Sequence, residues 1–439
     1  MANIFLDTVQ PLTTEIVSGN VDYAKVLQRL FNMQSYNIIG STSPLTPTSS
    51  DVIYLSPGKV YRFYSTVDEN LTGPKLVGNF VSSSAEIEYL KATIKLEMSS
   101  LDRESIRFVR PTTISGVSFS SASPKLNQPF IRFTGTSSSF SKVISCNFGS
   151  TGKSSPVIIC DQPKIECSDC AFTTEGISLS TTNNCNEIIF SYNLNHGVAR
   201  AIDSVAPSGG CKYTITNNTL DISGQLLRSS GRVLSGSLIS KNVVENHEKG
   251  FINDANNGHC VYINGQIDGI SILDNVFSGA DSINGDTTQT GVIDRFIRRP
   301  DTCIKIDGSR PKNNIVIRRN VFRYPKFYAL ELSTPLTSLI ITGNVFSGIS
   351  NNLMRCACWV IGGLRVTNPT INSNMINSIQ NNFVSNFINF DSSIVTGASV
   401  KNNLVCTPGE TAVGLGVGSS GNTIKKNFET LLDNEILEV

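Results

Sequence analysis

A short phrase of apolar and polar positions recurs along most of this chain. An apolar residue, two variable residues, an asparagine, a variable residue and a second apolar residue follow one another, as in ITNNTL, ILDNVF and ITGNVF. Most successive asparagines lie 23 to 25 residues apart, and the longer intervals are 29, 30, 33 and 45 residues. The asparagines are Asn147, Asn193, Asn218, Asn242, Asn275, Asn320, Asn344, Asn374, Asn403 and Asn427, with Cys170 in one slot and Asn382 as an alternative to Asn374. The pattern predicts a repeat architecture with insertions in some turns.

A period near two dozen residues fits both leucine-rich repeats and parallel β-helices. Leucine-rich repeats need several leucines and usually a helical segment in each unit, whereas these units carry Ile, Val, Phe, Asn, Ser and Gly with strand alternation. The sequence therefore predicts an all-β, right-handed parallel β-helix, a solenoid of about a dozen coils over residues 111–430. Asparagine tolerates the left-handed backbone of a tight bend, and asparagines stacked about 4.8 Å apart can bond along the axis.

A second phrase precedes many of these asparagines and has the alternation of a short strand. Its copies are AIDS (201–204), VYINGQ (261–266), IKIDGS (304–309), LELST (330–334), WVIGG (359–363) and INFDSS (388–393). Alternation directs Ile263, Ile306 and Leu332 inward, with Trp359 on the same inward parity, and leaves two outward columns. The first outward column is Tyr262, Lys305, Glu331, Val360 and Asn389. The second is Asp203, Asn264, Asp307, Ser333, Gly362 and Asp391.

The segment before the repeats has a different pattern. Apolar residues at helical spacing within 19–34, with Asp22 placed as the N-cap, predict a short helix. A strand, a Pro-Gly turn and a second strand follow at 51–66. We expect an N-terminal arm at 1–18, a capping helix and entry coils at 19–110, the β-helix at 111–430, and a C-terminal cap or subunit contact at 431–439.

Composition and charge exclude several classes of protein. The 36 Lys and Arg against 35 Asp and Glu leave a net charge of +1 without long runs of either sign, which argues against nucleic-acid binding. No run of eighteen apolar residues and no secretory leader pattern occurs, so we expect neither a membrane span nor a signal peptide. The eleven cysteines are scattered, and pairs such as Cys167-x-x-Cys170 and Cys356-x-Cys358 lack partners at zinc spacing. We expect reduced thiols, no metal and no cofactor.

The short helix, the linker and the apolar strand leading into Ser56-Pro57-Gly58 resemble the entry segment of the pectate-lyase-like β-helix family, which includes phage tailspikes and capsule depolymerases. The likeness is one of fold and extends over about residues 20–430. It implies a virion tail protein, made in the host cytoplasm, that binds and cleaves a bacterial surface polysaccharide during host attachment. It also implies contacts with other virion tail proteins and a parallel homotrimer. The alternatives are a non-catalytic receptor-binding or structural virion protein, and a secreted pectinase, which the missing leader pattern disfavours.

Candidate chemistry lies on the outward columns. Glycoside hydrolysis needs two carboxyl groups, and Asp307 and Glu331 fall on adjacent coils, two positions apart, at a diagonal separation of about 7 to 8 Å. That separation suits inversion, for which the two groups stand about 6.5 to 9.5 Å apart. Lys305 beside Glu331 favours its ionised form or binds an acidic sugar, and Tyr262 offers a ring for stacking. The competing interpretation is a surface Lys-Glu pair and a turn aspartate, and elimination by a lyase stays open.

The longest interval, between Asn275 and Asn320, contains the segment 278–301. Asp294, Arg295 and Arg298 in this insertion are predicted to bind substrate, because arginine forks suit acidic or phosphorylated glycans. A solvated loop is the alternative. Asp203 and Asp391 are the next carboxylates to consider if Asp307 and Glu331 have no catalytic role.

Overall fold

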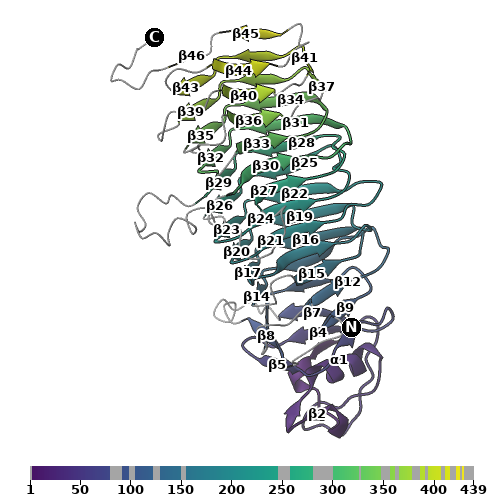
Figure 1. The fold of residues 1–439 in the computed structure, drawn as a ribbon. Helices are drawn as coiled ribbons and strands as arrows, with labels where there is room; N and C mark the ends of the chain where they lie inside the picture. Colours follow the sequence, from purple (N-terminus) through teal and green to yellow (C-terminus); the bar gives the residue numbers. More distant parts are fainter. Residues whose placement is uncertain are drawn as a thin grey trace, which may run out of the picture. The chain divides into compact units, whose positions relative to one another are not determined.

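The computed structural model describes residues 2–79, 91–97, 104–121, 129–149, 155–245, 258–279, 300–325, 328–347, 356–360, 365–377, 386–390, 394–406, 411–415, 422–425 and 428–429. It forms two compact units, residues 1–198 and 199–439. In each unit the chain winds through successive coils whose short strands pair in parallel with their equivalents on the next coil (Figure 1). The predicted right-handed parallel β-helix is confirmed.

Three parallel sheets make up the coils of the first unit, after a two-stranded hairpin of β2 (Ile16–Val17) and β3 (Asn20–Val21). The first sheet contains β1 (Asn3–Phe5), β4 (Val52–Leu55), β7 (Lys75–Asn79), β10 (Thr113–Ser115), β13 (Ser141–Ile144), β16 (Lys164–Ser168) and β19 (Glu187–Ser191). The second contains β5 (Val60–Phe63), β8 (Ala92–Leu96), β11 (Val117–Ser121), β14 (Asn147–Phe148), β17 (Ala171–Thr173) and β20 (Leu194–His196). The third contains β6 (Val67–Asp68), β9 (Ile106–Phe108), β12 (Ile131–Phe133), β15 (Pro156–Cys160) and β18 (Ile177–Thr181).

The second unit repeats this three-sheet arrangement. Its first sheet contains β22 (Lys212–Thr216), β25 (Ser237–Ser240), β28 (Ile270–Leu273), β31 (Lys312–Arg318), β34 (Leu336–Thr342), β37 (Arg365–Thr367), β38 (Thr370–Asn372), β41 (Ile394–Thr396), β42 (Ser399–Lys401) and β45 (Thr423–Lys425). The second contains β23 (Thr219–Asp221), β26 (Val243–Glu245), β29 (Val276–Ser278), β32 (Val321–Arg323), β35 (Val345–Ser347), β39 (Met375–Asn377), β43 (Leu404–Cys406) and β46 (Phe428–Glu429). The third contains β21 (Arg200–Ser204), β24 (Gln225–Ser229), β27 (His259–Ile263), β30 (Thr302–Ile306), β33 (Tyr328–Leu332), β36 (Cys356–Val360), β40 (Asn386–Phe390) and β44 (Thr411–Leu415).

The predicted helix is α1 (Tyr23–Phe31), which follows two 3₁₀ turns, η1 (Leu6–Thr8) and η2 (Thr13–Glu15). Asp22 caps it, because its carboxylate accepts a hydrogen bond from the Ala24 amide at 3.2 Å. The same carboxylate accepts from the Tyr64 amide at 3.0 Å. The helix is thereby joined to the entry coils, as Figure 1 shows at the purple end of the chain.

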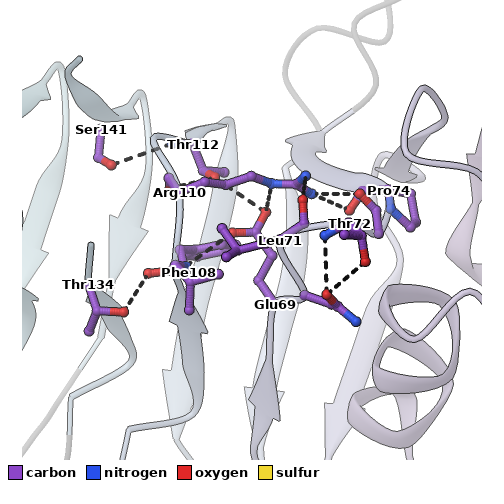
Figure 2. Close-up of polar contacts among 12 residues, drawn as sticks. Glu69, Leu71, Thr72, Pro74, Phe108, Arg110, Thr112, Thr134 and Ser141 are labelled. Atoms are coloured by element: carbon purple, nitrogen blue, oxygen red, sulfur yellow. Dashed lines mark hydrogen bonds and ion pairs between the residues drawn. The ribbon is translucent and has the colours of Figure 1, made fainter. Parts of the chain in front are cut away.

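Hydrogen bonds from Arg110 hold the segment after β6 against the next coil (Figure 2). The Arg110 guanidinium donates to the buried Glu69 carboxylate at 2.7 Å and to the carbonyls of Leu71, Gly73 and Pro74. Burial raises the pKa of Glu69, although Arg110 opposes this rise. Gly73 is required here because a Cβ atom would lie 2.1 Å from the carbonyl oxygen of Phe31, the last residue of α1.

Asparagine side chains form a continuous hydrogen-bonded row along the axis of the second unit. The Asn275 side-chain oxygen accepts from the backbone amide of Asn242 at 3.0 Å and from its side-chain amide at 2.9 Å. Its own side-chain amide donates to Ile239 O and to the next asparagine, Asn320. The row, here called the asparagine ladder, links Asn218, Asn242, Asn275, Asn320, Asn344, Asn374 and Asn403. Asn374, rather than Asn382, therefore occupies the repeat.

The ladder corrects two details of the prediction. The residue before each asparagine has the left-handed backbone, with φ of 58° at Asp274 and 53° at Arg319, so the asparagine itself does not make the bend. In the first unit Cys146, and not Asn147, occupies the repeat position on the coil before Cys170. Asn147 is the first residue of β14 and is exposed. Both cysteine thiols point to carbonyls of the preceding coil, as the asparagine amides do. A sulfur atom thus replaces the amide at these two positions.

Aromatic and aliphatic side chains fill the interior of each unit. The rings of Phe119, Phe148 and Phe172 stack in the first unit, with centroids 4.9 and 5.1 Å apart. Phe322 stacks between Phe277 and Phe346 in the second unit, at 5.7 and 5.0 Å. Among the residues that the structure describes, no helix has the length and apolar character needed to cross a membrane. Asn427 and residues 431–439 lie outside the described part.

Replacing Asn275 by alanine should lower the free energy of unfolding by about 2–4 kcal/mol, because the amides of both neighbouring ladder residues lose buried partners. Asn147→Ala is the matched control, since Asn147 is exposed and outside the ladder. It should change stability by less than about 0.5 kcal/mol. Urea or thermal unfolding of both variants measures the difference, and equal stabilities would contradict the role given to the ladder.

Candidate active site

A column of polar and aromatic residues runs along the outer surface of the third sheet in the second unit. The register pairs Asp203 with Arg228, Arg228 with Tyr262, Tyr262 with Lys305, and Lys305 with Glu331. Ile263, Ile306 and Leu332 alternate with this column and are fully buried, as predicted. The column therefore displays one side chain on each of five successive coils.

Two positions of the predicted columns are wrong. Glu331 pairs with Trp359, and Val360 pairs with Leu332, so the alignment of WVIGG was shifted by one residue. Trp359 therefore has the outward register position, and Val360 has the inward one. Asp203 pairs with Arg228 and belongs to the first column, not to the column of Asp307. The Asp203 error is a shift of two residues, which preserves the alternation, whereas residues 359–361 are all apolar, so their sequence does not indicate which of them points inward.

The second column follows the strand ends as predicted for Asn264, Asp307 and Ser333. The Asp307 amide donates to Ile263 O at 3.0 Å, and the Ser333 amide donates to Ile306 O at 2.8 Å. Because Lys305 is directly opposite Glu331, Asp307 lies diagonally from Glu331 on the adjacent coil. Asp307 and Glu331 thus have the diagonal arrangement that the sequence analysis predicted for an acid and base pair.

Glu331 is held by two side chains of the neighbouring strand β30. Lys305 Nζ lies 2.8 Å from Glu331 Oε1, and Thr302 Oγ1 donates to Glu331 Oε2 at 3.2 Å. Glu331 is only 8% exposed, so little water competes with these contacts. The ammonium of Lys305 and the hydroxyl of Thr302 therefore fix the position of the Glu331 side chain.

Asp307 has a different environment. Burial raises the pKa of its carboxyl group, the hydrogen bond from Tyr262 and the charge of Lys305 oppose this rise, and the nearby charge of Glu331 adds to it. Tyr262 OH donates to Asp307 Oδ2 at 3.2 Å, while Asp307 Oδ1 is buried and has no hydrogen-bond partner. The Asn264 side-chain amide in turn donates to Tyr262 OH at 3.1 Å. Asp307 therefore has the raised pKa that a general acid requires.

A third set of residues, which the sequence analysis did not identify, lies beside the column at the start of each strand. Arg200 bonds both Asp203 and Gln225, and the His259 ring lies 5.7 Å from the Tyr262 ring. The set is Arg200, Gln225, His259, Thr302 and Tyr328, all nearly buried. The aligned phrase began after these positions. Extending the copies by one or two residues towards the N-terminus would have found all of them except Gln225, whose strand has no aligned copy.

The remaining predicted residues lie elsewhere or outside the described structure. Asp294, Arg295 and Arg298 belong to a segment that the structure does not describe, and so does Asp391. Their role in substrate binding stays a prediction. Within the described residues, no three His, Cys, Asp or Glu side chains are grouped so that they could hold a metal ion.

Comparisons with known proteins identify a structural relative. No family model matches the chain, and neither does any curated protein. A solved structure of a tailspike protein mutant of E. coli bacteriophage HK620, in complex with a pentasaccharide, aligns with a TM-score of 0.53 and 13% identity. The alignment covers 96% of this chain and 80% of that one. A second mutant of the same tailspike, in complex with a hexasaccharide, aligns at 0.52 and 12% over the same shares. This likeness confirms the expected resemblance in fold.

Replacing Tyr262 by phenylalanine should raise the pKa of the Asp307 carboxyl further, because the hydrogen bond that favours its ionised form is lost. Carbon-13 NMR titration of labelled aspartate, assigned with Asp307→Asn, measures the change. Tyr64→Phe is a control on a distant tyrosine and should leave the titration as it is. An unchanged titration in Tyr262→Phe would show that the hydroxyl does not influence this carboxyl.

Proposed function

We propose that this chain is a phage tailspike-like protein that binds and cleaves a bacterial cell-surface polysaccharide during host attachment. The observation that carries the proposal is the pair Asp307 and Glu331 on adjacent coils at outward register positions, in contrasting environments. Burial favours a proton on Asp307, whereas Glu331 is paired with Lys305 and accepts a hydrogen bond from Thr302. The likeness in fold to a tailspike solved with bound oligosaccharide supports the same class of partner.

The proposed reaction is hydrolysis with inversion. Asp307 donates its proton to the glycosidic oxygen as the bond to the anomeric carbon breaks. Glu331 removes a proton from a water molecule whose oxygen attacks the same carbon from the opposite side, and the products are two shorter glycans. Lys305 and Thr302 hold the Glu331 carboxylate towards that water. Tyr262 and the proposed loop residues Asp294, Arg295 and Arg298 contribute to glycan binding.

Asp307→Asn and Glu331→Gln should each lower turnover by a factor of about a hundred or more, with glycan binding and folding nearly unchanged. Asp274→Asn is the matched control, because Asp274 lies in the bend before Asn275, pairs with Arg319 and belongs to neither outward column. A panel of capsule and O-antigen polysaccharides, assayed for new reducing ends, tests hydrolysis. Unsaturated products, detected by absorbance, would indicate elimination instead.

Two other results would redirect the proposal. Near-normal turnover in either variant would remove that residue from the chemistry and direct attention to Asp203, Asp294 or Asp391. Binding of a glycan that the parent protein does not cleave would favour the alternative, a non-catalytic receptor-binding or structural protein of the virion.

We also propose that the chain functions as a homotrimer attached to other tail proteins of the virion. An apolar column on the outer side of the second sheet supports self-association. Its members pair in register along the axis and comprise Val243, Val276, Val321, Val345, Met375 and Leu404. At the coil spacing of about 4.8 Å these six side chains span about 24 Å. A second copy lying parallel to the first presents the same repeat, which makes it a well-matched partner.

Charges beside the apolar column fit the same arrangement. Lys241 and Glu245 are exposed on opposite sides of Val243, on one coil. Copies arranged side by side around a parallel symmetry axis bring Lys241 of one copy towards Glu245 of the next. The cationic and anionic edges are therefore complementary between copies.

Val321→Lys should convert the oligomer to a monomer in solution, because it places a charge at the centre of the apolar column. Val316→Lys is the control, since Val316 is half-exposed on the first sheet and outside the column. Light scattering after size-exclusion chromatography measures the mass at micromolar concentration. A monomeric parent protein, or an oligomer unaffected by Val321→Lys, would contradict this interface.

A further inference from the structure

Lys312 is a fully buried lysine at the start of β31. Its Nζ donates to the carbonyl oxygen of Arg310 at 2.7 Å and to that of Gly308 at 3.5 Å. Thr334 Oγ1 donates to the same Arg310 oxygen at 3.2 Å. These carbonyls belong to the bend that directly follows Asp307. The ammonium group therefore holds the bend from inside the coil.

The coils on either side place apolar residues where this lysine lies. Parallel pairing aligns Lys312 with Ile267 and Val233 on one side and with Leu336 and Val366 on the other. These four residues are buried. An apolar residue fits this position without the desolvation cost of a charge, so the stacking of the coils does not explain a lysine. The exception falls on the coil that carries Asp307.

Gly308 shows how closely this bend is packed against the neighbouring coil. Its φ of +90° lies in the left-handed region, and a Cβ atom would be 2.6 Å from Asn264 Oδ1. Asn264 also donates to Tyr262 OH, which donates to Asp307. Asp307 is thus held from the neighbouring coil by the Asn264–Tyr262 pair, and its bend is held from the interior by Lys312.

Among the described residues, Lys305, Glu331 and Lys312 act on Asp307 through their charges, and Tyr262 acts on it through a hydrogen bond. Asp307 and Arg310 act on Lys312. Burial lowers the pKa of Lys312 to about 8, while the negative charge of Asp307 opposes that change. At neutral pH the lysine is therefore predominantly a buried cation.

We propose that Lys312 is a positioning residue for Asp307, because its ammonium group, bonded to Arg310 O and Gly308 O, fixes the bend that presents this carboxyl. The role assigned to Asp307 in catalysis rests on the proposed function. The coupling between the two residues does not depend on it. Lys312 touches no substrate and acts only through Asp307.

The test uses the full chain with Lys312→Met, which matches the apolar residues of the adjacent coils, and Lys312→Gln, which keeps a donor for Arg310 O without the charge. Leu336→Met, at the equivalent position of the next coil, is the control. The first readout is the NMR titration of Asp307. Its pKa should rise in both Lys312 variants and stay unchanged in Leu336→Met.

The second readout is stability against pH. The folded-state pKa of about 8 is below the ordinary value of 10.5, so the unfolded chain binds more protons between these values. The melting temperature of the parent protein should therefore rise relative to that of Lys312→Met as the pH increases from about 8 to 10.5. A difference in melting temperature that stays constant over this pH range would show that the pKa of Lys312 is not lowered. An unchanged Asp307 titration in both Lys312 variants would overturn the proposal.

The third readout separates this inference from the proposed function. If Asp307 is the general acid, the basic limb of the kcat/KM profile should move to higher pH in both Lys312 variants by the same amount as the Asp307 titration. A titration that moves in a protein without glycan cleavage would support the positioning role and reject the proposed function. A basic limb that stays fixed while the titration moves would show that Asp307 is not the acid, and Lys312 would remain its positioning residue.

Discussion

The asparagine ladder is the interaction on which the architecture depends. A buried amide has two donor hydrogens and an acceptor oxygen, and each ladder asparagine satisfies them with the preceding and following coils. A coil shifted by one residue would leave those groups unpaired in the interior, at a cost of about 1–3 kcal/mol for each. The ladder therefore stabilises one register between neighbouring coils. Apolar side chains alone specify the register between coils less strictly, because they have no hydrogen-bonding groups that a shift would leave unpaired.

That register determines the outer surface as well as the core. Because side chains alternate across each strand, coils in a single register align their outward residues in straight columns. On the third sheet the columns bring together Tyr262, Lys305 and Glu331, although the segment 278–301 separates Tyr262 from Lys305 along the chain. On the second sheet the same effect creates the apolar column that includes Val276 and Val321. The proposed glycan-binding face and the proposed self-association face are thus two consequences of one stacking rule.

The candidate site gains its chemistry from departures within this regular stack. Glu331, Thr302 and Lys312 place polar or charged groups in buried surroundings, where apolar residues would be less costly. Lys305 and Thr302 compensate Glu331, and the carbonyls of Gly308 and Arg310 compensate Lys312. Asp307 stays incompletely compensated, with one buried oxygen unpartnered. This difference between two nearby carboxyl groups is what an acid and base pair requires.

The sequence alone determined the fold class, the repeat, the capped helix and the pairing of Lys305 with Glu331, because each depends on local periodicity or on spacing that recurs many times. Short strands were harder to align: Trp359 and Asp203 were assigned to the wrong columns, and Asn147 was taken for a ladder residue in place of Cys146. Only the tertiary structure decided these registers and revealed Thr302, Tyr328 and Lys312 around the site. The physical reason is that burial and hydrogen bonding between coils are properties of residues about 24 or more positions apart, whereas a local pattern records only which way a side chain alternates.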